Sequence, residues 1–151
     1  MIYLDNSATT RVTDETARLM CECMTEGYFN PSALYAPAME AEKKMSACRE
    51  RLLSELHAPL GAQAVFTSGG TEALALALNG AAAGARLAGA TEHPAVLEAA
   101  PEAIRIAVDV HGRAILPDLP ADALVAIQQV NNESGVVQDM AAIAAAVHAA
   151  G

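Results

Sequence analysis

The sequence predicts an α/β fold, a mostly parallel sheet with helices on both faces, preceded by N-terminal helices. From about residue 61 onward, short apolar segments alternate with helix-like segments, which is the pattern of βαβ units. The expected strands are mostly apolar. Such strands are typical of a sheet that is covered on both faces.

Residues 1–60 are expected to form an N-terminal segment with two helices. Thr13 or Asp14 can cap a first helix that runs to about Glu26. Asn30-Pro31-Ser32 predicts a turn, because a residue before proline is pushed away from helical geometry. A long amphipathic helix then follows over residues 37–57 and ends near Pro59.

Residues 61–151 are expected to form one larger α/β domain. A strand at 64–67 leads through a glycine turn into a buried helix at 71–83. The remaining elements alternate along the chain: strands are expected at 86–90, 104–110 and 124–130, and helices at 94–100 and 139–150.

Composition and charge exclude several classes of function. The net charge of -9 supplies no basic surface, so a nucleic-acid or anionic-membrane partner is not expected. The Ala-rich stretch at 73–90 is interrupted by polar residues and is too short to span a bilayer. Three cysteines without a disulfide framework, and an N-terminus unlike a signal peptide, predict a cytoplasmic protein.

The run Phe66-Thr67-Ser68-Gly69-Gly70-Thr71-Glu72 predicts an anion site. The first turn of a helix offers unpaired N–H groups, and the helix dipole adds positive charge there. Gly69 and Gly70 let the backbone approach a phosphate closely, and the Thr71 hydroxyl adds a donor. The alternative is a tight strand-to-helix turn that binds nothing.

Two further polar runs are expected where strands end, which is where ligands bind in open α/β sheets. In Thr91-Glu92-His93-Pro94, His93 can stack on a flat ligand or shuttle a proton. The alternative is a helix cap or a satisfied core histidine. In Val130-Asn131-Asn132-Glu133-Ser134-Gly135, amides and a carboxylate can bind a polar ligand, and the alternative is turn chemistry.

A metal site or a nucleophilic cysteine is not expected. Cys21 and Cys23 lie two residues apart on an expected helix, so they point to different faces and cannot chelate together. Cys48 has no evident partner, and nothing near these thiols marks a reactive cysteine.

The order and spacing of these motifs resemble the cysteine desulfurases, which belong to the class V aminotransferase group of fold-type I pyridoxal-phosphate (PLP) enzymes. The similarity runs through essentially the whole chain. The runs that carry it are Tyr3-Leu4-Asp5-Asn6-Ser7-Ala8-Thr9-Thr10, Asn30-Pro31-Ser32, Phe66-Thr67-Ser68-Gly69-Gly70-Thr71-Glu72, Thr91-Glu92-His93 and Val130-Asn131-Asn132-Glu133-Ser134-Gly135-Val136-Val137-Gln138.

The resemblance implies the N-terminal part of a PLP-binding large domain and a role for four residues. Gly70 and Thr71 match the pair that holds the PLP phosphate. His93 matches the catalytic histidine that stacks on the pyridine ring, and Asn132 matches the asparagine at the cofactor or the substrate carboxylate. The family converts L-cysteine to L-alanine and passes the sulfur on as a persulfide to an acceptor protein, for iron–sulfur cluster or thiocofactor assembly. Its members are dimers.

The chain lacks other residues that the resemblance implies. The family's Asp at the pyridine nitrogen, Schiff-base lysine, substrate-binding arginine and catalytic cysteine have no counterpart, and the only lysines are Lys43 and Lys44. We therefore expect a truncated desulfurase that is inactive alone and associates with a second copy or a separately encoded C-terminal part. The alternatives are a non-catalytic binding or interaction module, or another class V enzyme such as a selenocysteine lyase.

Overall fold

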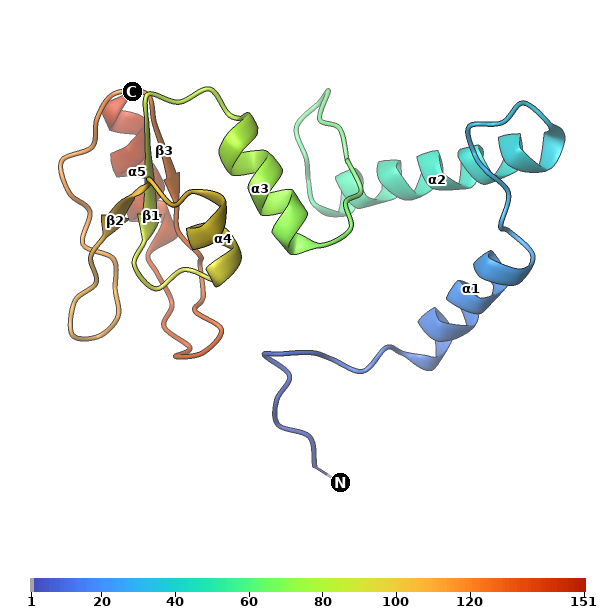
Figure 1. Cartoon of the computed structure of the whole chain (residues 1–151), viewed down its shortest axis with the longest axis horizontal. Helices are drawn as coiled ribbons and strands as arrows, with labels where there is room; N and C mark the ends of the chain where they lie inside the picture. The colour runs from blue at the N-terminus through green and yellow to red at the C-terminus, as the bar shows by residue number, and fades with distance from the viewer. Residues whose placement is uncertain (1) are drawn as a thin grey trace. The chain divides into compact units, whose positions relative to one another are not determined.

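The structure, a computed structural model, describes residues 2–151, and these form five helices and three strands (Figure 1). The chain divides into two compact units, one up to Phe66 and the other from Thr67 onward. In chain order the elements are α1 (Asp14–Thr25), α2 (Ala36–Glu55), α3 (Gly70–Gly80), β1 (Ala85–Gly89), α4 (Pro94–Ala99), β2 (Ile104–Ile106), β3 (Ala123–Ala126) and α5 (Met140–Ala150).

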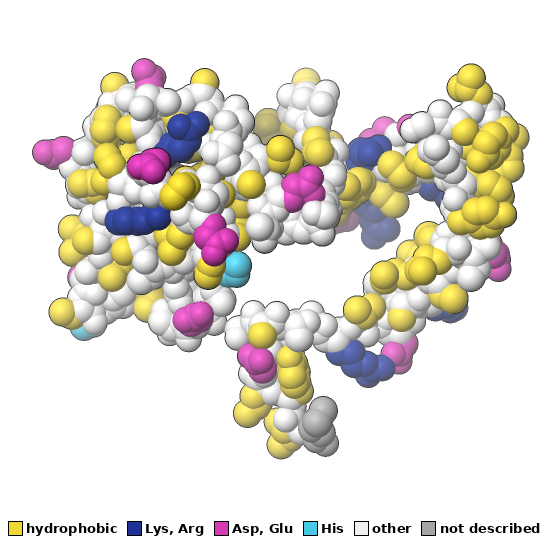
Figure 2. Space-filling model, in the orientation of Figure 1, with side chains coloured by type: hydrophobic (Ala, Val, Ile, Leu, Met, Phe, Trp, Pro, Cys, Tyr) yellow, Lys and Arg dark blue, Asp and Glu magenta, His cyan; other side chains and the backbone are white. Residues whose placement is uncertain are grey.

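The first unit contains two helices, α1 and α2, and chain outside regular secondary structure. The Thr13 side chain caps α1 by accepting a hydrogen bond from the Thr16 amide at 3.2 Å. Only Ala38 is fully buried among residues 2–66. Figure 2 shows hydrophobic side chains along α1, where Leu19, Met20 and Met24 are exposed. Within this unit the helices therefore surround no apolar core.

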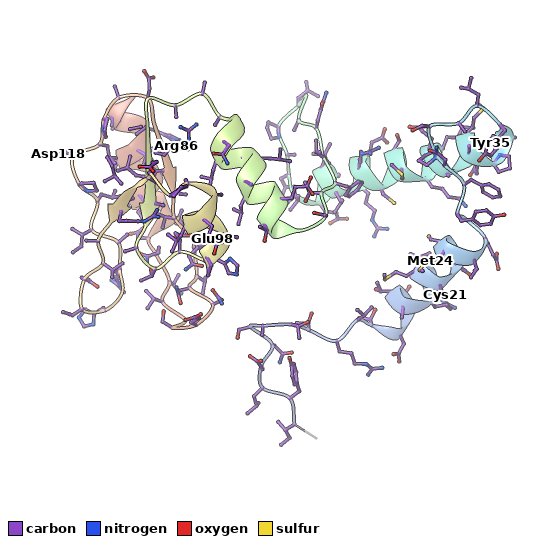
Figure 3. The ribbon with its side chains drawn as sticks, viewed as in Figure 1. Cys21, Met24, Tyr35, Arg86, Glu98 and Asp118 are labelled. Carbon is purple, nitrogen blue, oxygen red and sulfur yellow. The ribbon has the colours of Figure 1, made fainter. Side chains whose placement is uncertain are left out.

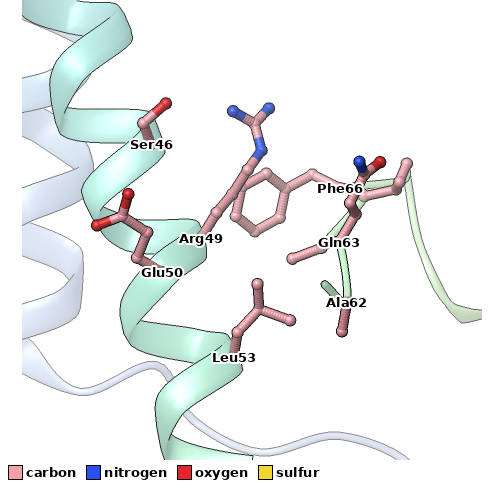
Figure 4. Close-up of a pocket in the computed structure, with 9 residues that line it drawn as sticks. Ser46, Arg49, Glu50, Leu53, Ala62, Gln63 and Phe66 are labelled. Atoms are coloured by element: carbon pink, nitrogen blue, oxygen red, sulfur yellow. The ribbon is translucent and has the colours of Figure 1, made fainter. Parts of the chain in front are cut away.

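The predicted strand at 64–67 is wrong, because this segment is extended but pairs with no other strand. It lies beside α2 instead, and with that helix it lines a shallow hollow (Figure 4). The Arg49 guanidinium lies over the Phe66 ring, 5.3 Å from its centroid. A short apolar run has the composition of a strand, but it becomes one only when a neighbouring strand supplies the hydrogen bonds.

The second unit contains a parallel three-stranded sheet of order β2-β1-β3, which confirms the predicted fold class. Leu87, at the centre of β1, lies opposite Ile104 of β2 and Val125 of β3. β2 and β3 are shorter than the predicted strands at 104–110 and 124–130, because the residues that follow them form turns and polar loops.

Helices cover both faces of this sheet, as expected from its apolar strands. On one face, Leu78 of α3 and Val96 of α4 pack with Ala88 of β1, where small side chains allow close approach. Leu87 and Ile106 are buried on the other face, and Figure 1 shows α5 behind the sheet. Ile143 is the buried residue of α5. The helix expected at 71–83 is α3, which ends earlier, at Gly80. It is also less enclosed than predicted, since Leu78 is its one buried residue.

Arg86 fixes the end of α3 against the start of β1 (Figure 3). Its guanidinium donates to the backbone carbonyls of Leu78 at 2.7 Å and Ala81 at 3.1 Å. These carbonyls lie at the C-terminus of α3, where helix carbonyls have no helical partner and the dipole is negative. The bonds therefore hold α3 to the strand that follows it.

The strand order changes direction at β1. From β1 the chain passes through α4 to β2 on one side, and then crosses to β3 on the other side of β1. Ligands in open α/β sheets bind beyond the carboxyl ends of the strands at such a switch point. The loops that follow β1 and β3 are therefore the place to examine for a site. No helix in the described part of the chain has the length and apolarity needed to cross a bilayer.

Replacing Leu87 by alanine should lower the free energy of unfolding by about 2–5 kcal/mol, because the side chain is 1% exposed at the middle of the sheet. Leu76, which is 56% exposed on α3, provides the matched control, and Leu76→Ala should change that free energy by about 0.5 kcal/mol or less. Urea denaturation followed by circular dichroism measures both. Equal losses in the two variants would contradict the assigned core.

Candidate functional site

The loops after β1 and β3 are joined by three hydrogen bonds. The carbonyl oxygen of Thr91 accepts from Gln128 Nε2 at 2.9 Å and from Asn131 Nδ2 at 3.0 Å. The Glu92 carboxylate accepts from the backbone amide of Gln128 at 2.7 Å. Because β1 and β3 are neighbouring parallel strands, their carboxyl ends meet at one edge of the sheet, and these bonds extend that pairing into the loops.

Glu92 is a buried carboxylate, with 9% of its surface exposed. A Cβ atom added at Gly89 would lie 2.9 Å from its Oε1 atom, so glycine at that position makes room for the carboxylate. Burial raises the pKa of Glu92 above its ordinary value, and the hydrogen bond from the Gln128 amide opposes that rise. Sequence reasoning placed Glu92 within a motif but assigned it no role.

His93 caps the N-terminus of α4. Its Nδ1 atom accepts a hydrogen bond from the Ala95 amide at 3.1 Å, which requires Nδ1 to be unprotonated and places the ring proton on Nε2. The side chain is exposed, and Nε2 has no hydrogen-bond partner within residues 2–151. The alternative of a helix cap is therefore correct for one nitrogen, and the other nitrogen remains open to a ligand.

The two neighbouring asparagines have different environments. Asn131 Oδ1 accepts from the backbone amides of Glu133 at 3.0 Å and Ser134 at 2.8 Å, and Asn131 Nδ2 donates to Thr91. Asn131 therefore builds the turn, as the alternative predicts for such a residue. The Asn132 side chain is exposed and forms no hydrogen bond within the described residues, so it can contact a ligand.

The first turn of α3 has the donors that the glycine motif predicts. Gly69 is the N-cap and offers no side-chain cap, and the amides of Gly70, Thr71 and Glu72 have no acceptor within residues 2–151. Space beside Gly69 and Gly70 is open, and Thr71 is exposed. Unpaired amides and a hydroxyl at the positive end of a helix dipole suit a phosphate.

The exposed Glu72 carboxylate stabilises this turn through Ser68. It accepts from both the amide and the hydroxyl of Ser68, each at 2.6 Å. The bond from the hydroxyl, and to a smaller extent the bond from the amide, lowers the pKa of Glu72 below its ordinary value. The carboxylate thus holds the Ser68 donors and leaves those of Gly70 and Thr71 open.

The four predicted site residues lie at one end of the second unit. α3 joins β1 through residues 81–84 and runs opposite to it, which brings the first turn of α3 to the end where β1 and β3 finish (Figure 1). Hydrogen bonds join the His93 loop to the Asn132 loop. None joins either loop to Gly70 or Thr71 within residues 2–151.

Comparison with known proteins identifies the family. The model of the aminotransferase class-V family matches residues 2–151. The chain belongs to this family. It is 38% identical to a cysteine desulfurase of Frankia sp. (strain EuIK1), with 100% of this chain and 42% of the relative aligned. It is 40% identical to the cysteine desulfurase IscS of Pectobacterium atrosepticum, with 94% of this chain and 40% of the relative aligned.

Solved structures of related proteins have the same fold. A NifS-like protein superposes with a TM-score of 0.87 at 27% identity, over 98% of this chain and 45% of the other. A NifS-like protein from Rickettsia africae superposes with a TM-score of 0.84 at 27% identity. The class-V chain described here spans less than half the length of the relatives that it matches.

The lysines and cysteines of the chain all belong to the first unit. Lys43 and Lys44 are both on α2, in the first unit. No cluster of three metal-ligating side chains occurs among residues 2–151. Cys21, Cys23 and Cys48 are free and exposed, and they also belong to the first unit.

The pKa values of Glu72 and Glu92 should be shifted in opposite directions, that of Glu92 above its ordinary value and that of Glu72 below it. The contribution of Glu92 to stability then falls as pH rises from its ordinary pKa through its raised one, because the folded state disfavours the charged form. The contribution of Glu72 is present above its ordinary pKa and is lost as pH falls through its lowered pKa.

Carbon-13 NMR of the glutamate carboxyl groups measures both midpoints. The Glu92→Gln variant should show a flatter dependence of unfolding free energy on pH above the ordinary glutamate pKa, since the titrating group is gone. Midpoints displaced in the same direction would contradict the two environments described above.

Proposed function

We propose that this chain supplies the phosphate-binding and ring-covering half of a PLP site in a cysteine desulfurase. The observation that carries the proposal is the placement of three kinds of group at one end of the sheet. These are the donor turn at Gly70 and Thr71, the open imidazole edge of His93 and the open amide of Asn132. The reaction of the complete enzyme would convert L-cysteine to L-alanine and leave the sulfur as a persulfide.

Each residue present fits one part of PLP. The amides of Gly70 and Thr71, with the Thr71 hydroxyl, would hold the phosphate. His93, whose orientation is fixed by its bond to Ala95, would cover the flat ring and move protons through Nε2. Asn132 would hold a polar edge of the cofactor or the substrate carboxylate. When bound, PLP supplies the electron sink for chemistry at the carbon that carries the amino group.

A PLP enzyme needs an amine to hold the cofactor, and Lys43 and Lys44, on α2, match no such residue of the family. Cys21, Cys23 and Cys48 likewise match no catalytic cysteine of the family. In this proposal the amine and the thiol would come from protein outside residues 1–151. The partners would be a second copy of the chain or a polypeptide that carries the remaining residues, together with a sulfur-acceptor protein for iron–sulfur cluster assembly. Free exposed cysteines suit a cytoplasmic location.

The second candidate function is a non-catalytic binding module. The absence of any lysine from residues 67–151 favours it. The two functions share the phosphate site and differ in whether added protein restores the reaction with L-cysteine.

Inorganic phosphate should bind at the first turn of α3, and Thr71→Val should weaken that binding by about two- to tenfold, the range for loss of one hydrogen bond. Nitrogen-15 NMR titration with phosphate follows the amides of Gly70 and Thr71. Thr10→Val is the matched control, because Thr10 is exposed and is not part of the first turn of α3. Phosphate shifts that map to other residues, or equal weakening in both variants, would sink the assignment.

PLP should bind this chain weakly and without capture by one lysine. The reason is that no lysine lies in the unit that contains the donor turn. Borohydride reduction followed by peptide mass spectrometry should find no single modified lysine, and L-cysteine should yield no more alanine than with PLP alone. Stoichiometric modification of Lys43 or Lys44 would overturn the half-site.

A further inference from the structure

Glu92 is the one buried acidic residue in the part of the chain that the structure describes. No lysine, arginine or histidine forms an ion pair with it, since the one ion pair among residues 2–151 joins Arg11 and Asp14. A buried carboxylate without a cation is unfavourable unless hydrogen bonds compensate for the lost water. Its presence at the carboxyl end of β1 therefore requires a local reason.

The contacts of Glu92 supply that reason. Oε1 accepts from the Gln128 amide at 2.7 Å, which joins the residue after the end of β1 to the chain leaving β3. The Glu92 amide donates to the Gly89 carbonyl at 3.2 Å, so the residue is also fixed to its own strand. The carboxylate thus bridges two strand ends. Glu92 lies one residue before His93, and Gln128 lies four residues before Asn132.

Two features strengthen the hydrogen bond between the Gln128 amide and Glu92 and fix its geometry. An ionised acceptor forms a stronger hydrogen bond with a backbone amide than a neutral one does. Gly89 leaves room on one side of the carboxylate, because any Cβ there would push Oε1 away from Gln128. The Thr91 carbonyl adds two parallel bonds, from Gln128 Nε2 and Asn131 Nδ2, so the loops cannot slide past each other without breaking three bonds.

We propose that Glu92 is a positioning residue, which acts through Gln128 to set the distance and orientation of His93 relative to Asn132. The inference deepens the function proposed above and rests on it for the roles of His93 and Asn132. Glu92 itself touches no ligand in this scheme. Its role is to keep the ring-covering and amide-bearing loops in one arrangement.

The test uses four variants of the full chain. Glu92→Ala removes the acceptor, and Glu92→Gln keeps an oxygen of the same reach without the charge. Gly89→Ala keeps Glu92 but displaces its carboxylate. Glu98→Gln is the control, because Glu98 is exposed on the neighbouring helix α4 (Figure 3).

Hydrogen exchange of the Gln128 amide reports the bridge directly. Glu92→Ala and Gly89→Ala should each raise its exchange rate by about ten- to hundredfold, the range for loss of a hydrogen bond to a charged group. Glu92→Gln should raise the rate by less, and Glu98→Gln should leave it unchanged. The NMR signals of the His93 ring and the Asn132 side chain should move in Glu92→Ala and in Gly89→Ala. In Glu92→Gln they should lie closer to their wild-type positions.

Two outcomes would overturn the proposal. One is an unchanged Gln128 amide and unchanged His93 signals in Glu92→Ala. The other is an equal rise in exchange at Gln128 and at the central sheet amide of Leu87 in both Glu92→Ala and Gly89→Ala, which would make Glu92 a general stability residue. A phosphate titration of the same samples separates the two proposals, because its failure in the wild type rejects the phosphate site while the exchange result still decides the role of Glu92.

Discussion

The hydrogen bonds between the loops after β1 and β3 are the constraint on which the site depends. The parallel pairing of Ala85–Ala88 with Ala123–Ala126 aligns the two strands, but pairing ends where the strands end. Beyond that point the Thr91 carbonyl and the Glu92 carboxylate replace the ladder with bonds to Gln128 and Asn131. Without them, the two loops would be joined to each other only through the sheet, and irregular loops are the mobile parts of a domain.

The small side chains of this protein serve that arrangement. Ala88, Ala95 and Ala100 are buried where α4 meets the sheet, and their size lets the helix approach closely. His93 caps that same helix, so its place depends on how close α4 lies to β1. Gly89 continues the pattern by leaving the space that Oε1 of Glu92 requires. A composition poor in aromatic residues is therefore connected to the position of a polar site.

The sequence predicted the elements that have strong local signals. Thr13 as one of two candidate caps, the parallel sheet and the helix at 139–150 were all available from residue type and spacing. The segment 64–67 was misread because a strand is defined by its neighbour, and no local pattern reveals whether a neighbour exists. The overlong strands at 104–110 and 124–130 have a similar cause, since apolar runs continue into turns that distant partners stabilise.

The sequence predicted the residue types that form the site. It did not predict which of them build the loops and which remain open to a ligand. A glycine turn before a helix, a histidine and an amide pair each indicate ligand binding by residue type. Which asparagine builds the turn depends on Thr91, forty residues away from Asn131 in the chain. The use of Glu92 depends on Gln128 and Gly89, and that combination forms no recognisable spacing. Contacts between distant segments decide such roles, and they appear only when the fold is known.

The described residues leave apolar side chains of the first unit and one edge of the sheet uncovered. Residues 2–66 expose Leu19, Met20 and Met24 on α1 and bury only Ala38 fully, although apolar side chains in water favour burial. β3 is an edge strand, whose outer side can accept a further strand. Exposed apolar side chains and an open strand edge each favour association with further protein. Both units therefore present surfaces that a second chain can cover.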